Sequence, residues 1–142
     1  MKYLLDTDHI SFLQRKSGQE YENIIRHIRQ HSSRDFAFSI ISFHEQIIGA
    51  HTFIVRSQNP EKLIKGYGLL QQVINTFSKA NILDFDENSV QIFERLKCEK
   101  ITLATMDLRI ASIALSQDLI LLTRNRKDFS KVPNLILEDW TT

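Results

Sequence analysis

The chain has 142 residues, of which 42% are hydrophobic and 25% charged, and this length and composition favour one folded domain over residues 1–142. Its formal net charge of +1 excludes a strongly basic protein, so nucleic-acid binding would need a local basic patch. No run of about 18 apolar residues is present, which excludes a membrane span. The lone cysteine, Cys98, cannot form an internal disulfide, and with no signal-peptide pattern this favours the cytoplasm.

Short apolar runs alternate with helical periodicities along the whole chain. The first run, Lys2 to Leu5, predicts a strand, and a helix is expected to follow from about Thr7. The other expected elements are helices over 19–31, 42–55, 61–79, 87–97 (capped by Asp86) and 107–117, and strands over 35–41, 81–85, 119–123 and 134–138. Apolar strands that alternate with helices predict an α/β fold with a central parallel sheet flanked by helices.

The helix expected over 61–79 is unusually regular. Its apolar residues step by four, three, four and three, which is typical of a helix packed along a partner; they are Leu63, Tyr67, Leu70, Ile74 and Phe77. The short turn "SQNP" makes the helix over 42–55 the expected partner, in a helical hairpin. Leu69, Val73 and Ile48 would then remain uncovered, as part of an interface with another protein.

Two acids follow the first expected strand. Asp6 and Asp8 lie one residue apart at the carboxyl end of this strand, where open parallel sheets bind ligands. Their like charges repel unless a positive charge lies between them. Alternatively, Thr7 or Asp8 caps the next helix.

Asp107 and Glu45 are the other candidate acids. At about 100° per residue, Asp107 lies between Ile110 and Ala111 in the middle of an apolar helix face, where an ionised carboxylate needs a partner. Asp107 is also suited to be an N-cap or a first-turn acid that interacts with the helix dipole. Glu45 fits a capping box with Ser42. It also points away from the apolar stripe of its helix, so the periodicity is compatible with a solvated residue as well.

The segment "TRNRKDF" (123–129) follows the most apolar strand. It offers two oxygen ligands, from Asn125 and Asp128, and three cations suited to phosphate, Arg124, Arg126 and Lys127. No glycine-rich phosphate loop and no serine or cysteine nucleophile motif is present. His27 and His31 are spaced i, i+4 but have no third ligand nearby, which argues against zinc.

Four motifs, "LLDTDHIS", "SIISFHEQIIGA", "ATMDLRIASIAL" and "LILLTRNRKDF", occur in the order and approximate spacing of a PIN domain. The chain most resembles the VapC-type ribonuclease toxins of bacterial toxin–antitoxin pairs. The resemblance implies a PIN-like fold with a protruding helical hairpin, and an acidic pocket that binds Mg²⁺ or Mn²⁺ and cleaves RNA. By motif position, Asp6, Glu45 and Asp107 match the three family acids and are the implied catalytic and metal-binding residues.

The family's fourth acidic position falls in "TRNRKDF", where Asn125 stands in place of the Asp of some relatives. Asn125 is a possible further ligand, and Asp8 and Asp128 are outer-sphere partners or alternative fourth acids. If residues 125–129 form one helical turn, Asn125 and Asp128 lie on one face. Arg124, Arg126 and Lys127 would hold the RNA backbone.

The resemblance also implies a homodimer inhibited by a cognate antitoxin. The lack of a long apolar run argues against a membrane partner. The first alternative is a non-catalytic PIN-fold module that binds RNA or protein. The second, an Mg²⁺-dependent phosphoacceptor domain, needs an acid midway along the chain and a lysine after a late strand. Asp84 lies too late for the first requirement, and Arg124 and Asn125 stand where the lysine is needed.

Overall fold

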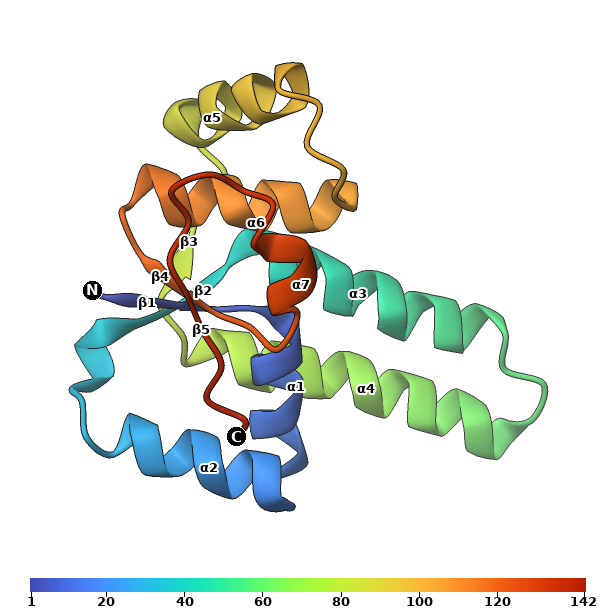
Figure 1. Cartoon of the computed structure of the whole chain (residues 1–142). Helices are drawn as coiled ribbons and strands as arrows, with labels where there is room; N and C mark the ends of the chain where they lie inside the picture. Colours follow the sequence, from blue (N-terminus) through green and yellow to red (C-terminus); the bar gives the residue numbers. More distant parts are fainter.

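The computed structural model describes all residues, 1–142, and contains five parallel strands in one sheet. The order across the sheet is β3-β2-β1-β4-β5, so the first strand lies at its centre (Figure 1). The strands are β1 (Tyr3–Leu5), β2 (Phe36–Ser39), β3 (Ile82–Leu83), β4 (Ile120–Leu122) and β5 (Leu137–Glu138). The predicted parallel α/β fold is confirmed.

Helices cover both faces of the sheet (Figure 1). They are α1 (Thr7–Arg15), α2 (Gln19–Ile28), α3 (Ile40–Val55), α4 (Pro60–Ser78), α5 (Glu87–Cys98), α6 (Thr105–Ser116) and α7 (Arg126–Phe129), with a short 3₁₀ helix at Ser33–Asp35. Successive residues of β1 point to opposite faces, so Leu4 packs with α5 and α6 while Leu5 packs with α1, α2 and α4. None of the helices is long and apolar enough to cross a membrane.

The pairing of β1 places three chain segments at one edge of the sheet. Tyr3 is in register with Phe36 of β2 on one side and with Ile120 of β4 on the other. The backbone N–H of Asp6 then donates to the carbonyl of Leu122 at 2.9 Å. The segments that follow β1, β2 and β4 therefore meet at the carboxyl edge, where parallel sheets bind ligands.

Several predicted boundaries differ from the structure, because the strands are shorter than expected and some helices begin or end elsewhere. The second helix ends at Ile28 rather than at residue 31, and the strand expected over 35–41 ends at Ser39. Ser39 caps α3, because its hydroxyl accepts the N–H of Ser42 at 3.0 Å. The predicted capping box of Ser42 and Glu45 is therefore wrong; the apolar residues 40 and 41 extend the strand pattern but form the first turn of the helix.

Helices α3 and α4 form the predicted hairpin, which projects from the body of the protein (Figure 1). The predicted contact seam is confirmed for Phe77, which is buried, and is wrong for three of its residues. Gly66, Val73 and Phe77 are the buried residues of α4, whereas Leu63, Tyr67 and Ile74 are exposed. The reason is close approach at Gly66, where an added Cβ would lie 2.7 Å from Ile54 Cγ1. Accordingly, Leu69 is half-buried and Val73 buried, and of the three residues expected to remain uncovered only Ile48 is exposed.

Candidate metal centre

Asp6 lies where β1 ends and α1 begins. Its Oδ1 accepts the N–H of Thr7 at 2.8 Å, so Asp6 itself is the N-cap of α1, not Thr7 or Asp8 as the capping alternative proposed. Its Oδ2 accepts the hydroxyl of Thr123 at 2.7 Å. The side chain is buried, and burial and the charge of Asp8 raise the pKa of Asp6 to about 7 although both hydrogen bonds lower it.

Asp8 bridges α1 to the segment after β4. One carboxylate oxygen, Oδ1, lies 2.7 Å from Nδ1 of His9, and Oδ2 accepts the N–H of Arg124 at 2.9 Å. The carboxylate is partly exposed. Its negative charge raises the pKa of both Asp6 and Asp107, which places it among the candidate acids.

Asp107 lies in the first turn of α6. The N-cap position is occupied by Ala104, so the N-cap alternative for Asp107 is wrong. Burial, followed by the charges of Glu45, Asp128 and Asp8, raises the pKa of Asp107 to about 6. The carboxylates of Glu45, Asp128 and Asp8 therefore lie near enough to Asp107 for their charges to act on it. We refer to Asp6, Asp8, Glu45, Asp107 and Asp128 as the acid cluster.

Glu45 is half-buried in the second turn of α3. Its Oε1 accepts the hydroxyl of Thr7 at 2.8 Å, and that hydroxyl also lies 2.9 Å from Oγ of Ser42. Because Thr7 has one hydroxyl proton and donates it to Glu45, Ser42 donates to Thr7. This chain of hydroxyls holds Glu45 against the start of α1.

Asn125 and Asp128 lie together, as expected for a helical turn over 125–129. The structure forms this turn as α7, and Asn125 Nδ2 donates to Asp128 Oδ2 at 3.1 Å. The backbone N–H of Asn125 donates to the Thr123 hydroxyl at 3.0 Å. The amide oxygen of Asn125 therefore stays available as a neutral ligand, whereas Asp128 contributes charge beside Asp107.

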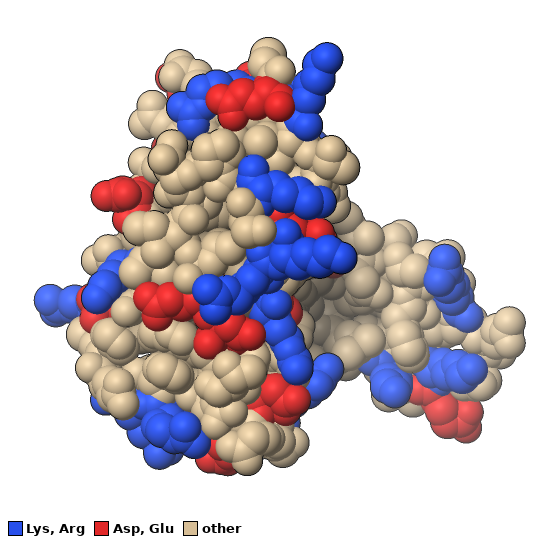
Figure 2. All heavy atoms as spheres, in the orientation of Figure 1, with Lys and Arg blue, Asp and Glu red and all other residues tan.

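The three cationic side chains of residues 123–129 differ in how far nearby groups compensate their charge. The Arg124 guanidinium lies 3.8 Å from Glu20 and over the ring of Phe12, so its charge is partly compensated. Arg126 and Lys127 are exposed and form no ion pair within 4.0 Å. Figure 2 shows Lys and Arg side chains gathered over the region of α7, next to the hollow between the body and the hairpin.

Sequence reasoning missed the polar residues that hold the acids. Thr7, Ser42 and Thr123 position Glu45 and Asp6, and His9 contacts Asp8. A signal existed for two of them, because Thr7 and Thr123 stand within two residues of the ends of expected strands. Ser42 was assigned to a cap that the structure does not form.

The donor chemistry of the acid cluster fits a hard divalent cation. All of its donors are oxygens, which Mg²⁺ and Mn²⁺ prefer. No three acidic, histidine or cysteine side chains enclose an ion as they stand, so the cluster is not a closed cage. Such a cage is not required, since Mg²⁺ keeps several waters and uses few carboxylates together with substrate phosphate.

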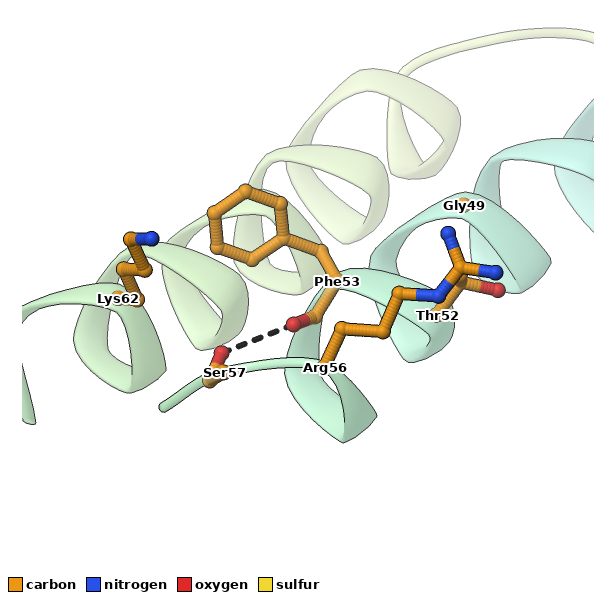
Figure 3. Close-up of a pocket in the computed structure, with 6 residues that line it drawn as sticks. All are labelled: Gly49, Thr52, Phe53, Arg56, Ser57 and Lys62. Atoms are coloured by element: carbon orange, nitrogen blue, oxygen red, sulfur yellow. Dashed lines mark hydrogen bonds between the residues drawn. The ribbon is translucent and has the colours of Figure 1, made fainter. Parts of the chain in front are cut away.

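Two hollows adjoin along α3. The first, of about 380 Å³, is lined by Thr7 and Glu45 of the site and by hairpin residues that include Gln46 and Gln72. The second, of about 340 Å³, lies toward the hairpin turn and carries Arg56 and Lys62 with no acid (Figure 3). Both include Gly49, so the hollow surface runs from the acid cluster to the hairpin turn.

The parallel sheet with acids at its carboxyl edge defines an α/β protein with a candidate metal site. Comparisons with known proteins then identify the family. The PIN domain family model matches residues 3–135. VapC2 ribonuclease of Rickettsia felis is 29% identical over 99% of this chain and 98% of that protein, and VapC1 ribonuclease of Haemophilus influenzae is 30% identical over 99% of each. A solved structure, VapBC2 of Rickettsia felis bound to a DNA fragment from their promoter, superposes with a TM-score of 0.73 at 27% identity and covers 99% of each chain.

The chain therefore belongs to the PIN domain family. Both the predicted fold and the predicted resemblance to VapC-type proteins are confirmed.

Proposed function

We propose that this protein is a divalent-metal-dependent endoribonuclease and the toxin of a toxin–antitoxin pair. Its full-length relatives are named ribonucleases, and the superposed structure is a VapBC complex. The metal is Mg²⁺ or Mn²⁺, and Asp6, Glu45 and Asp107 are its principal ligands, with Asn125 as a possible fourth.

The observation that carries this proposal is that several carboxylates lie near one another at the carboxyl edge of the sheet, and that two of them have a raised pKa. Asp6 and Asp107 have pKa values of about 7 and 6, because burial and neighbouring carboxylates disfavour their charged forms. A protein gains no stability from such repulsion, whereas a cation would relieve it. Clusters of this kind are typical of catalytic sites.

Each residue of the site has a role in the proposed reaction. When bound, the cation would lower the pKa of water and neutralise charge on the substrate phosphate. Asp6 supplies a buried charge and Asp107 a half-buried one, and Thr123 and Thr7 fix the carboxylates of Asp6 and Glu45. A carboxylate of the cluster whose pKa is near neutral is also suited to accept a proton from the attacking water.

RNA would lie across the rim of the site. Arg126 and Lys127, which lack acidic partners, would contact backbone phosphates, and Arg124 would do so more weakly because it interacts with Glu20. The hollow that begins at Glu45 offers a path along α3.

The exposed apolar side chains of the hairpin suit protein partners. They are Ile40, Ile48, Val55, Leu63, Ile64, Tyr67 and Ile74. Apolar surface gathered on one projecting element is typical of an interface. We infer that the hairpin serves the antitoxin and the homodimer.

The test is incubation of purified protein with total RNA and millimolar Mg²⁺ or Mn²⁺, followed by mapping of the cut ends. We expect cleavage that stops with a chelator. Asp6→Asn keeps the capping oxygen but removes the charge, so it should lower the cleavage rate at least on the order of 100-fold while the fold remains intact.

Asp118→Asn is the matched control. Asp118 lies before β4, at the opposite edge of the sheet, in a left-handed conformation that Asn also tolerates. It should cleave like the wild type. Metal-independent cleavage, or full activity of Asp6→Asn, would contradict the proposal; RNA binding without cleavage would favour the non-catalytic module.

A further inference from the structure

His9 is a fully buried histidine that the proposed reaction does not use. It follows Asp8 in α1 and bonds with both ring nitrogens. Nδ1 lies 2.7 Å from Oδ1 of Asp8, and Nε2 accepts the backbone N–H of Trp140 at 3.1 Å. His9 thus joins the acid cluster to the C-terminal segment, 131 residues away in sequence.

These two contacts assign the tautomer of His9. A backbone N–H is only a donor, so Nε2 must present its lone pair to Trp140 and the proton must lie on Nδ1. Nδ1–H then donates to the Asp8 carboxylate. Asp139 does not change this assignment, because its Oδ1 is 3.8 Å from Nε2 and already accepts the N–H and the hydroxyl of Thr141 at 2.9 and 2.6 Å.

The segment that fixes His9 is itself firmly held. The Trp140 ring is buried, stacks on His27 with centroids 4.8 Å apart, and meets Tyr3 edge-on at 4.7 Å. The carbonyl of Thr141 accepts a hydrogen bond from Asn23 Nδ2 at 2.8 Å. The backbone N–H of Trp140, which orients His9, therefore belongs to a well-packed segment.

Asp8 depends on His9 for its orientation. Its other short hydrogen bond comes from the N–H of Arg124 at 2.9 Å. The Thr123 hydroxyl, at 3.4 Å, gives its proton to Asp6 at 2.7 Å instead. Without His9, a single donor would remain, and the partly exposed carboxylate would be free to turn toward solvent.

We propose that His9 is a positioning residue that holds the Asp8 carboxylate beside Asp6 and thereby strengthens divalent-cation binding. The inference rests on the proposed function, since it assumes that the acid cluster binds a cation. Partners that orient the groups around a metal contribute on the order of 10- to 100-fold in metal affinity.

Two substitutions separate the contacts of the two ring nitrogens. In His9→Asn, the amide nitrogen occupies the place of Nδ1, so the donor to Asp8 is kept and the acceptor for Trp140 is lost. In His9→Gln, the amide oxygen reaches the place of Nε2, so the acceptor for Trp140 is kept and the donor to Asp8 is lost. The measurements are Mn²⁺ affinity by calorimetry and Tm without metal.

We expect His9→Gln to lower Mn²⁺ affinity about tenfold or more, and His9→Asn to keep affinity closer to that of the wild type although its Tm is lower. In an Asp8→Asn background, His9→Gln should have no further effect on affinity, because the contact it removes acts through the charge of Asp8. ¹⁵N NMR of the wild type at neutral pH should show His9 as the neutral Nδ1–H tautomer.

Several results would overturn the inference. They are unchanged Mn²⁺ affinity in His9→Gln, affinity losses that follow Tm in both variants, or an Nε2–H tautomer. If the wild type binds Mn²⁺ and cleaves RNA while His9→Gln matches it, this inference alone fails. If the wild type neither binds Mn²⁺ nor cleaves RNA, the proposed function fails as well.

Discussion

Two opposing effects act on the charge of Asp6 when no cation is bound. As the N-cap of α1 it benefits from negative charge near the helix N-terminus, but burial and Asp8 disfavour that charge. The raised pKa of Asp6 shows that the unfavourable effects are larger. The stability of the metal-free protein should therefore fall as the pH rises, whereas a carboxylate paired with a cation would make it rise.

The first prediction concerns this pH dependence. Because the pKa of Asp6 is about 7 in the folded protein and near 3.8 when unperturbed, the folded state binds more protons between these values, and stability falls as pH rises from about 4 to 7. Asp107, with a pKa of about 6, adds in the same direction. In a chelator, Tm should be several degrees lower at pH 8 than at pH 5.5.

Asp6→Asn isolates the contribution of this residue, since the variant does not titrate there. Its Tm should change less between the two pH values than that of the wild type. An equal change in both proteins would show that Asp6 does not have a raised pKa.

The second prediction separates Asn125 from Asp128. Asn125→Asp adds a carboxylate to the acid cluster, so calorimetry should show tighter Mn²⁺ binding, and the loss of the Asn125–Asp128 hydrogen bond should lower the metal-free Tm. Asp128→Asn should change Mn²⁺ affinity little. If Asp128→Asn abolishes binding and Asn125→Ala leaves it unchanged, Asp128 is the ligand instead.

At the scale of elements, the α3–α4 hairpin shows how one residue sets the rotation of a helix. Gly66 allows the backbones to approach, and this brings Val73 and Phe77 to the inner face while Tyr67 remains outside. The apolar spacing of α4 is compatible with more than one rotation about its axis. Close contact at Gly66 selects among them.

The third prediction compares two glycines of α4. In Gly66→Ala the new Cβ would meet Ile54 Cγ1 at 2.7 Å and the Ile54 backbone Cα at 3.3 Å, so the Ile54 side chain or the helices must shift and stability should fall by about 1–3 kcal/mol. In Gly68→Ala the new Cβ meets nothing within 4 Å apart from its chain neighbours and the backbone of its own helix. This variant should gain up to about 1 kcal/mol from helix propensity. Urea unfolding measures both; effects of the same sign would contradict this packing.

At the scale of the whole molecule, the hairpin leaves a large apolar surface uncovered. Ile64 and Tyr67 are 73% and 56% exposed on the projecting part of the fold. An isolated chain would expose this surface to water, which favours association.

The fourth prediction is that the protein is a homodimer at tens of micromolar. Tyr67→Lys should weaken self-association or antitoxin binding while the circular-dichroism spectrum shows an unchanged fold, because the side chain is exposed. Val90→Lys, at an exposed apolar residue of α5, is the control and should change neither. Light scattering and pull-down measure the two kinds of association, and a monomeric wild type would contradict the dimer.

The fifth prediction is that divalent metal stabilises the folded chain. A cation that binds the folded state alone stabilises it by about 2.7 kcal/mol at 100 times its Kd. Thermal unfolding with Mn²⁺ should therefore show a higher Tm for the wild type and for Asp118→Asn, and a much smaller change for Asp107→Asn. Equal increases in all three would indicate binding elsewhere.

The sequence by itself determined the order of the elements and the edge at which Asp6 and the 123–129 segment meet. Apolar runs and helical periods are local patterns, and a parallel sheet then places the ends of its strands together. Glu45 and Asp107 were assigned as family acids by motif position. From local pattern alone, a cap was favoured for Glu45, and Asp107 was open between a site residue and a cap.

Only the tertiary structure decided how these side chains are held. Thr7 bonds to Glu45 across 38 residues and His9 to Trp140 across 131, and no local pattern encodes such contacts. The same holds for the rotation of α4, which follows from the approach of Ile54 to Gly66. The physical reason is that hydrogen bonds and packing depend on positions in space, whereas periodicity reports only which face of an element avoids water.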